Sequence, residues 1–163
     1  MREIRLIPER LAEVVEEARR WVGTPYRHKG RRRGVACDCI GLPYCIARDL
    51  GLDPGPDLDW YSPVPHAGRV EREAHERMGL VASGPGVNPG SHPAGLIGLF
   101  WAARRGLPQH FGVLARHPLA PEEVTVIHAL QRNRKVVEAR LSGPWSRRLV
   151  SLHALPGTYE VRP

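Results

Sequence analysis

Of the 163 residues of the chain, 42% are hydrophobic and 25% are charged, and these proportions exclude general disorder. The length predicts one domain over 1–163, whose core is large enough to need no disulfide or metal. The net charge is +7, but the basic residues are scattered along the whole chain, which disfavours nucleic acid as a partner and indicates weak attraction to an anionic polymer. No apolar run reaches the roughly 18 residues of a membrane span, and the first residues lack the features of a signal peptide, so we expect synthesis in the cytoplasm.

Residues 8–22 predict the first helix, because apolar side chains recur on one face and Pro8 and Gly23 suit its two ends. Residues 27–36, with three consecutive arginines, predict an exposed loop. A second helix should begin near Cys39, run through Leu50 and end at Gly51.

The middle of the chain is rich in turn residues. Four prolines in residues 53–66 (Pro54, Pro56, Pro63 and Pro65) exclude a long helix there. Residues 68–82 predict a third helix, and residues 83–94 predict a loop.

The second half predicts β-structure. Short β-type runs follow one another at 95–102, 110–116, 124–130, 134–141, 149–155 and 159–162. Arg132 and Asn133, between two of these runs, predict a hairpin turn. Helices followed by an antiparallel meander predict the α+β class.

The three cysteines, Cys37, Cys39 and Cys45, are an odd number within nine residues and do not resemble a disulfide framework. Cys39 lies at the predicted helix start, where backbone N–H groups and the helix dipole favour a thiolate, the nucleophilic form. Asp38 is placed to cap that helix. The alternative is that Cys39 is simply a small buried residue.

Two of the eight histidines lie inside apolar predicted strands, His110 at the start of one and His128 within another. A His buried in a strand needs a hydrogen-bond partner. Neighbouring antiparallel strands would bring the two rings together, with His110 as the base for Cys39 and His128 orienting it. A zinc site built from the cysteines and His28 is the competing hypothesis, but the spacing is not C-x₂-C and Cys45 would face elsewhere, so we expect no metal and no organic cofactor.

Several segments, taken in order, resemble the NlpC family of papain-like cysteine peptidases, and most of all the cell-wall peptidases encoded in phage-tail and gene-transfer-agent modules. The matching segments are 18–26 (ARRWVGTPY), 38–42 (DCIGL), 98–100 (GLF), 110–113 (HFGV), 127–129 (IHA), and 137–138 (VE) through 145–149 (WSRRL). Together they cover nearly the whole chain. The resemblance implies a papain-like α+β fold with N-terminal helices and a C-terminal antiparallel sheet.

The resemblance also implies roles. Cys39 matches the nucleophile, His110 the general base and His128 the residue that orients it. Tyr26 matches a tyrosine beside the catalytic Cys, and Asp38 a residue that faces the amine end of the substrate; core packing and plain capping are the alternatives for these two.

The implied substrate is the peptidoglycan stem peptide, cut between D-γ-glutamate and a diamino acid, by a protein that is incorporated in a phage tail or delivered to the cell wall. Two other functions stay open: a non-catalytic tail-assembly protein of the same fold, and an amidase or acyltransferase that uses the same Cys-His-His site. The sequence departs from the family at Ile40, where Ser is usual, and at Leu96, where Asp is usual.

Overall fold

A computed structural model describes residues 2–58, 61, 68–101 and 108–163. Pro63, Pro65, His66 and the last residue of the predicted 95–102 strand lie outside the described residues. In the described part, no helix is both long enough and apolar enough to cross a membrane.

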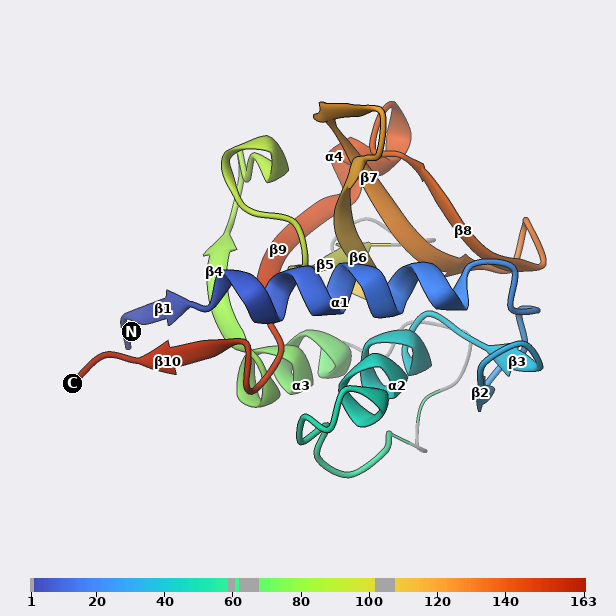
Figure 1. Ribbon diagram of the computed structural model, residues 1–163, viewed down its shortest axis with the longest axis horizontal. Helices are drawn as coiled ribbons and strands as arrows, with labels where there is room; N and C mark the ends of the chain where they lie inside the picture. The colour runs from blue at the N-terminus through green and yellow to red at the C-terminus, as the bar shows by residue number, and fades with distance from the viewer. Residues whose placement is uncertain (1, 59–60, 62–67, 102–107) are drawn as a thin grey trace.

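The predicted first helix is confirmed as α1, Pro8–Trp21. Its buried side chains, among them Leu11, Val14, Ala18 and Trp21, repeat at the spacing that marks one helix face. In Figure 1, α1 runs across the front of the large sheet, with α2 (Gly41–Asp49) and α3 (Arg69–Arg77) below it.

The predicted third helix is confirmed over most of its length, but its last five residues, 78–82, are not helical. The helix ends at Arg77, Met78 is already extended, and β4, Gly79–Ser83, follows it directly. A Cβ at position 79 would stand 2.8 Å from the ring of Tyr159, so the residue that opens this strand has to be Gly. The 83–94 loop contains one turn of 3₁₀ helix, η1, Pro89–Ser91.

Six strands form the main antiparallel sheet, in the order β4-β9-β5-β6-β7-β8. Besides β4, these are β5 (Ile97–Trp101), β6 (Pro108–His117), β7 (Ala120–Leu130), β8 (Lys135–Arg140) and β9 (Leu149–Ala154). The predicted meander holds for β5 to β8, and the predicted hairpin turn joins β7 to β8. The chain then returns, and β9 pairs on the far side of β5.

Several short elements escaped prediction. β1 (Ile4–Leu6) pairs with β10 (Tyr159–Val161), so the predicted last strand leaves the main sheet and joins the N-terminus. The predicted 27–36 loop contains a small hairpin, β2 (Arg31–Arg32) with β3 (Ala36–Cys37). The one-turn helix α4, Pro144–Arg148, precedes β9. Elements of two to five residues are too short to give a hydrophobic period.

The strand register sorts the side chains of β6 and β7 onto two faces. Val113 pairs with Ile127, and both belong to the core cluster that packs against the helices. Side chains alternate along a strand, so His110 and His128 both lie on the other face. Gly112 lies between them: a Cβ there would meet Val126 at 2.5 Å and the Cβ of His128 at 3.3 Å.

Candidate active site

The start of α2 is held by Asp38. Its Oδ1 accepts a hydrogen bond from the backbone N–H of Gly41 at 2.8 Å, and its backbone carbonyl accepts the N–H of Leu42 at 3.1 Å. This is the N-capping geometry that the sequence predicted for Asp38. Cys39 and Ile40 form the turn between the cap and the helix, so the Cys39 thiol is fixed at the helix N-terminus as expected.

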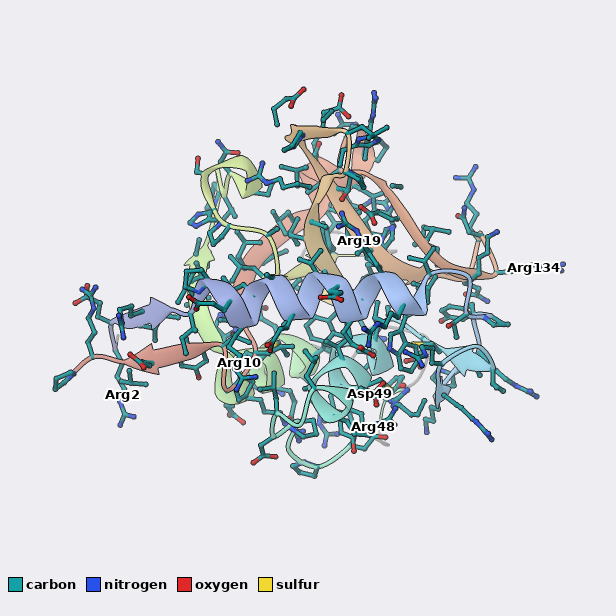
Figure 2. All side chains as sticks on the ribbon, in the orientation of Figure 1. Arg2, Arg10, Arg19, Arg48, Asp49 and Arg134 are labelled. Atoms are coloured by element: carbon teal, nitrogen blue, oxygen red, sulfur yellow. The ribbon has the colours of Figure 1, made fainter. Side chains whose placement is uncertain are left out.

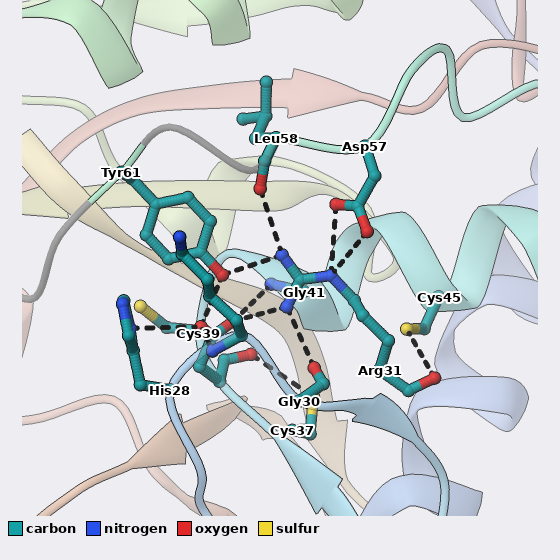
Figure 3. A network of polar contacts seen from close by, with 12 residues as sticks. His28, Gly30, Arg31, Cys37, Cys39, Gly41, Cys45, Asp57, Leu58 and Tyr61 are labelled. Atoms are coloured by element: carbon teal, nitrogen blue, oxygen red, sulfur yellow. Dashed lines mark hydrogen bonds and ion pairs between the residues drawn. The ribbon is translucent and has the colours of Figure 1, made fainter.

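The Asp38 carboxylate is 1% exposed and fully engaged. Besides Gly41, it accepts hydrogen bonds from the Lys29 backbone N–H at 2.6 Å, from Arg31 Nη1 at 3.0 Å and from the Tyr61 hydroxyl. His28 Nδ1 lies 3.7 Å from Oδ2 (Figure 3). Four donors use the acceptor capacity of the carboxylate, so this geometry matches the capping alternative for Asp38.

Arg31 links this network to the following loop. Its guanidinium also donates to the Tyr61 hydroxyl at 2.7 Å and to both oxygens of Asp57 at 3.1 Å. These partners raise the pKa of Arg31, although burial opposes the change. Burial and Asp38 raise the pKa of the Tyr61 phenol. Sequence reasoning missed both residues, because Arg31 lay within a run of arginines that is typical of an exposed loop.

The Cys39 thiol is partly buried against the strand that carries His110. Its Sγ lies 3.7 Å from the backbone carbonyl of Gln109, to which the thiol donates a hydrogen bond. Burial, followed by the charge of Asp38, raises the pKa of Cys39 to about 12, while the backbone N–H groups of Phe111, Cys39 and Ile40 act to lower it. The free thiol is therefore protonated at neutral pH, contrary to the expected resting thiolate.

His110 and His128 meet as predicted. His110 Nε2 and His128 Nδ1 are 2.9 Å apart, within hydrogen-bond distance, and both rings are buried. Burial lowers the pKa of both rings, that of His128 to about 4, so both are neutral at pH 7. With Nε2 engaged by His128, Nδ1 is the ring nitrogen of His110 that is left to take a proton from a nucleophile.

An aromatic cluster encloses the two histidines. Trp145 of α4 lies over both rings, with centroids 4.7 Å from His110 and 5.0 Å from His128. Phe100 contacts Trp145 and His110, and the Arg148 guanidinium lies 4.9 Å from the Trp145 ring centroid. This apolar surrounding explains the low pKa values of both imidazoles. Sequence reasoning noted Trp145 only as part of a matching segment and gave it no role.

Tyr26 lies beside Cys39. It is half-buried and packs against the same core cluster, next to β3. Burial, and then the proximity of Cys39 and Asp38, raises the pKa of Tyr26 to about 12. The phenol is therefore a neutral hydrogen-bond donor near the thiol.

The thiols of the other two cysteines, Cys37 and Cys45, do not converge with that of Cys39 on one site. Cys37 Sγ contacts the backbone carbonyl of Asp38 at 3.2 Å, and Cys45 Sγ contacts that of Arg31 at 3.6 Å. Both are completely buried. In the described ranges, no three His, Cys, Asp or Glu side chains are grouped so as to hold a metal ion.

The two departures from the family pattern lie in apolar surroundings. Ile40 is 5% exposed and lines an apolar pocket with Tyr44, Leu58 and Phe111. Leu96 is fully buried beside Leu11. Neither position can present a polar group to a substrate.

The sequence matches no family model and no curated protein, but the structure resembles solved ones. One is described as similar to a lipoprotein of the NLP/P60 family, from Staphylococcus aureus subsp. aureus Mu50, with a TM-score of 0.61 and 15% identity. Another is the NlpC/p60 domain of the peptidoglycan hydrolase SagA, with a TM-score of 0.55 and 20% identity.

The chain has the NlpC/P60 fold. The matched region covers 91% of this chain and 42% of the staphylococcal protein, and 89% of this chain and 98% of the SagA domain. This confirms the expected papain-like α+β architecture. The chain thus spans less than half of the staphylococcal protein and nearly the full length of the SagA domain.

Proposed function

We propose that the protein is a cysteine peptidase that hydrolyses amide bonds in the stem peptides of peptidoglycan. The observation that carries the proposal is the contact between His110 and His128, because His110 lies on β6, the strand against which the Cys39 thiol packs. A nucleophile, a base and a residue that orients the base are the three parts that thiol-dependent amide hydrolysis needs. The SagA domain, named as part of a peptidoglycan hydrolase, supports the choice of substrate.

In the first step, the Cys39 thiol transfers its proton to His110 Nδ1 as the sulfur attacks the scissile carbonyl carbon. Because both imidazoles are neutral, the proton moves during attack and not beforehand. His128 holds the His110 ring through Nε2 and stabilises the imidazolium that forms.

The negative oxygen of the tetrahedral intermediate needs donors. Asp38 already takes the N–H groups of Gly41 and Leu42, so the first turn leaves those of Cys39 and Ile40 without helical acceptors. The Cys39 N–H is the donor we assign to the oxyanion, worth about 3 kcal/mol of transition-state stabilisation. His110 then protonates the leaving amine, and water releases the acyl group from the thioester with His110 again as base. These steps use only groups of this chain.

The proposal also covers the scissile bond, the substrate-binding residues and the association of the protein with a phage tail. The scissile bond is the one between D-γ-glutamate and a diamino acid, Tyr26 donates a hydrogen bond to the bound substrate, and Asp38 serves the substrate-binding surface by fixing Arg31 and Tyr61. The chain acts as one peptidase domain over 1–163. The proposal that the protein is associated with a phage tail is supported by the order of the matching segments. Finding phage-tail genes next to the gene of this protein would test it.

Digestion of purified peptidoglycan tests the proposal. We expect the wild-type protein to release fragments with a new free amine on the diamino acid, and the Cys39→Ala variant to release none while keeping its fold. Full activity of the variant would refute the mechanism. A folded wild-type protein without any activity would favour the non-catalytic alternative.

A further inference from the structure

One end of the molecule carries a group of exposed cations. We call these residues the basic end surface: Arg27, Arg32, Arg132, Arg134 and Lys135. Each is exposed, and within the described residues none of the five forms an ion pair with a carboxylate. Together they carry five of the 24 positive charges of the Lys and Arg side chains.

Backbone hydrogen bonds hold the two contributing segments side by side. Tyr26 N–H donates to the Arg134 carbonyl at 2.8 Å, and Val136 N–H donates to the Thr24 carbonyl at 2.9 Å. Arg27 N–H in turn donates to the Cys37 carbonyl at 3.0 Å, which joins the β2–β3 hairpin to the same ladder. Neighbouring segments of such a ladder lie about 4.8 Å apart, and Figure 1 shows β2, β3 and the β7–β8 turn at the same end of the molecule.

The opposite end of the molecule is different. There Arg5 pairs with Glu160, and Arg162 pairs with Glu3 at 2.7 Å, so the charges of β1 and β10 are compensated. Figure 2 shows Arg134 projecting at one end of the molecule and Arg2 at the other. Arg2 also forms no ion pair among the described residues, but the end that bears β2 and the β7–β8 turn carries five such cations.

The backbone of this end is fixed in an uncommon conformation. Lys29 and Arg134 have φ values of 63° and 59°, and they are the only residues other than Gly with positive φ in the described part of the chain. Such conformations cost energy for long side chains and persist where the surroundings impose them. The hydrogen bond from Tyr26 provides that constraint at Arg134.

The chain connects the basic end surface to the candidate active site through a few residues. Arg27 precedes His28, whose Nδ1 lies 3.7 Å from Asp38, and Asp38 precedes Cys39. The next step rests on the proposed function. A peptide bond through the γ-carboxyl of glutamate leaves its α-carboxylate free, and the last residue of the stem peptide ends in a second carboxylate. These two carboxylates outweigh the one free amine of the diamino acid, so a stem peptide is a net anion and its network a polyanion.

We infer that the basic end surface binds free carboxylates of stem peptides neighbouring the one that is cut. The surface would hold the protein on the insoluble polymer by several weak ion pairs while Cys39 acts on one strand. Exposed pairs of this kind are individually weak and sensitive to salt, so their effect should depend on their number and on ionic strength.

Sedimentation with insoluble peptidoglycan tests the inference in a Cys39→Ala background, where nothing is cut. The test variant is Arg132→Gln/Arg134→Gln; Gln at 134 meets the same backbone conformation as Arg. The matched control, Arg2→Gln/Arg162→Gln, removes the same charge at the other end. We expect the test variant to bind roughly tenfold more weakly at about 50 mM salt, the control to bind normally, and the difference to vanish near 0.5 M salt. Equal weakening of both variants, or of neither, would overturn the inference.

Modified polymer identifies the anion. Peptidoglycan with amidated carboxylates should lose the salt-sensitive part of binding, whereas peptidoglycan stripped of phosphate-bearing polymers should keep it. Loss on stripping, or equal affinity for a double-stranded DNA oligonucleotide, would assign the surface to a different anion and overturn the inference. Normal binding by a wild-type protein that cuts nothing would instead refute the proposed function and leave the surface standing.

Discussion

At the scale of single residues, the Cys39 thiol experiences opposing influences. The N–H groups at the helix start do lower its pKa, as the sequence predicted, but burial and the neighbouring Asp38 raise it to about 12. Sequence reasoning could not weigh these effects, because burial depends on the strand that packs against the turn. The resting thiol is therefore neutral, as is the imidazole of His110, the base that we propose for it.

Alkylation should depend on exposure more than on thiol pKa. Cys45 has a pKa raised only to about 11, but Cys37 and Cys45 are completely buried whereas Cys39 is partly exposed. We expect iodoacetamide to modify Cys39 first at neutral pH, and the rate to rise steeply toward alkaline pH as the thiolate forms. Peptide mapping after timed exposure measures this. Faster labelling of Cys45 would mean that the Cys39 turn is closed to reagents.

The two site histidines should not be equivalent. His110→Ala removes the base and should abolish most peptidoglycan hydrolysis. His128→Asn should retain part of it, because an amide oxygen can still accept the Nε2 proton of His110. Initial rates of hydrolysis for both variants, compared across pH, measure the difference.

His117 provides the control for this series. Its Nδ1 accepts the Leu119 N–H in a surface turn, so His117→Ala should leave the rate unchanged. His153 is unsuitable, because it is fully buried and bonded to Ser151 at 2.8 Å, and its loss would disturb the sheet. A loss in His117→Ala as large as in His110→Ala would show that the wrong histidine is paired with Cys39.

At the scale of elements, the start of α2 depends on one carboxylate. Asp38→Ala removes the helix cap, worth about 1 kcal/mol, and leaves the mostly buried Arg31 without its inner partner. Breaking a buried pair in this way costs roughly 3–5 kcal/mol, so we expect severe destabilisation. Asp38→Asn keeps the capping oxygen and should lose less. Urea denaturation measures both variants.

Asp57→Asn is the matched control, because it removes the more exposed carboxylate from the same guanidinium. Its side chain is 39% exposed, and a pair of that kind contributes at most about 1 kcal/mol. If Asp57→Asn were as damaging as Asp38→Ala, the stability of the loop would not depend on the cap.

The elements also show which parts of the fold and of the candidate site could be predicted from the sequence. Strand periodicity was enough to place His110 and His128 on one sheet face, because a β-hairpin with alternating side chains has few registers that bury its apolar residues. The contacts of Arg31 and Trp145 could not be predicted from the sequence. Both residues belong to elements of two to five residues, and their partners are distant in the sequence. The predicted helix over 68–82 is too long, because its apolar residues suit a short helix followed by a strand equally well.

At the scale of the whole molecule, buried neutral histidines make stability depend on pH. His128 and His153 have folded-state pKa values lowered to about 4 by burial, against about 6.5 when unfolded, and the pKa of His110 changes in the same direction. The unfolded chain therefore binds more protons between pH 6.5 and 4, so the free energy of unfolding falls as the pH falls through this window.

We expect His128 and His153 each to contribute a loss on the order of 3 kcal/mol by pH 4, and His110 to add a loss in the same direction. Urea denaturation at a series of pH values measures the slope. A His153→Asn variant, which can still bond Ser151, should show a shallower slope than wild type. Stability that stayed constant from pH 7 to pH 4 would contradict the buried, neutral state of these rings.

The pairing of β1 with β10 has a topological consequence. Ile4 lies opposite Val161, so the two ends of the described chain run antiparallel and emerge together, away from the β2–β3 hairpin (Figure 1). A short linker from residue 162 to residue 3 would close the chain into a ring without moving an element. New ends could then be opened at the exposed Leu119 in the β6–β7 turn. For the same reason, the unit can be inserted as one piece into a surface loop of another protein, held by two adjacent strands.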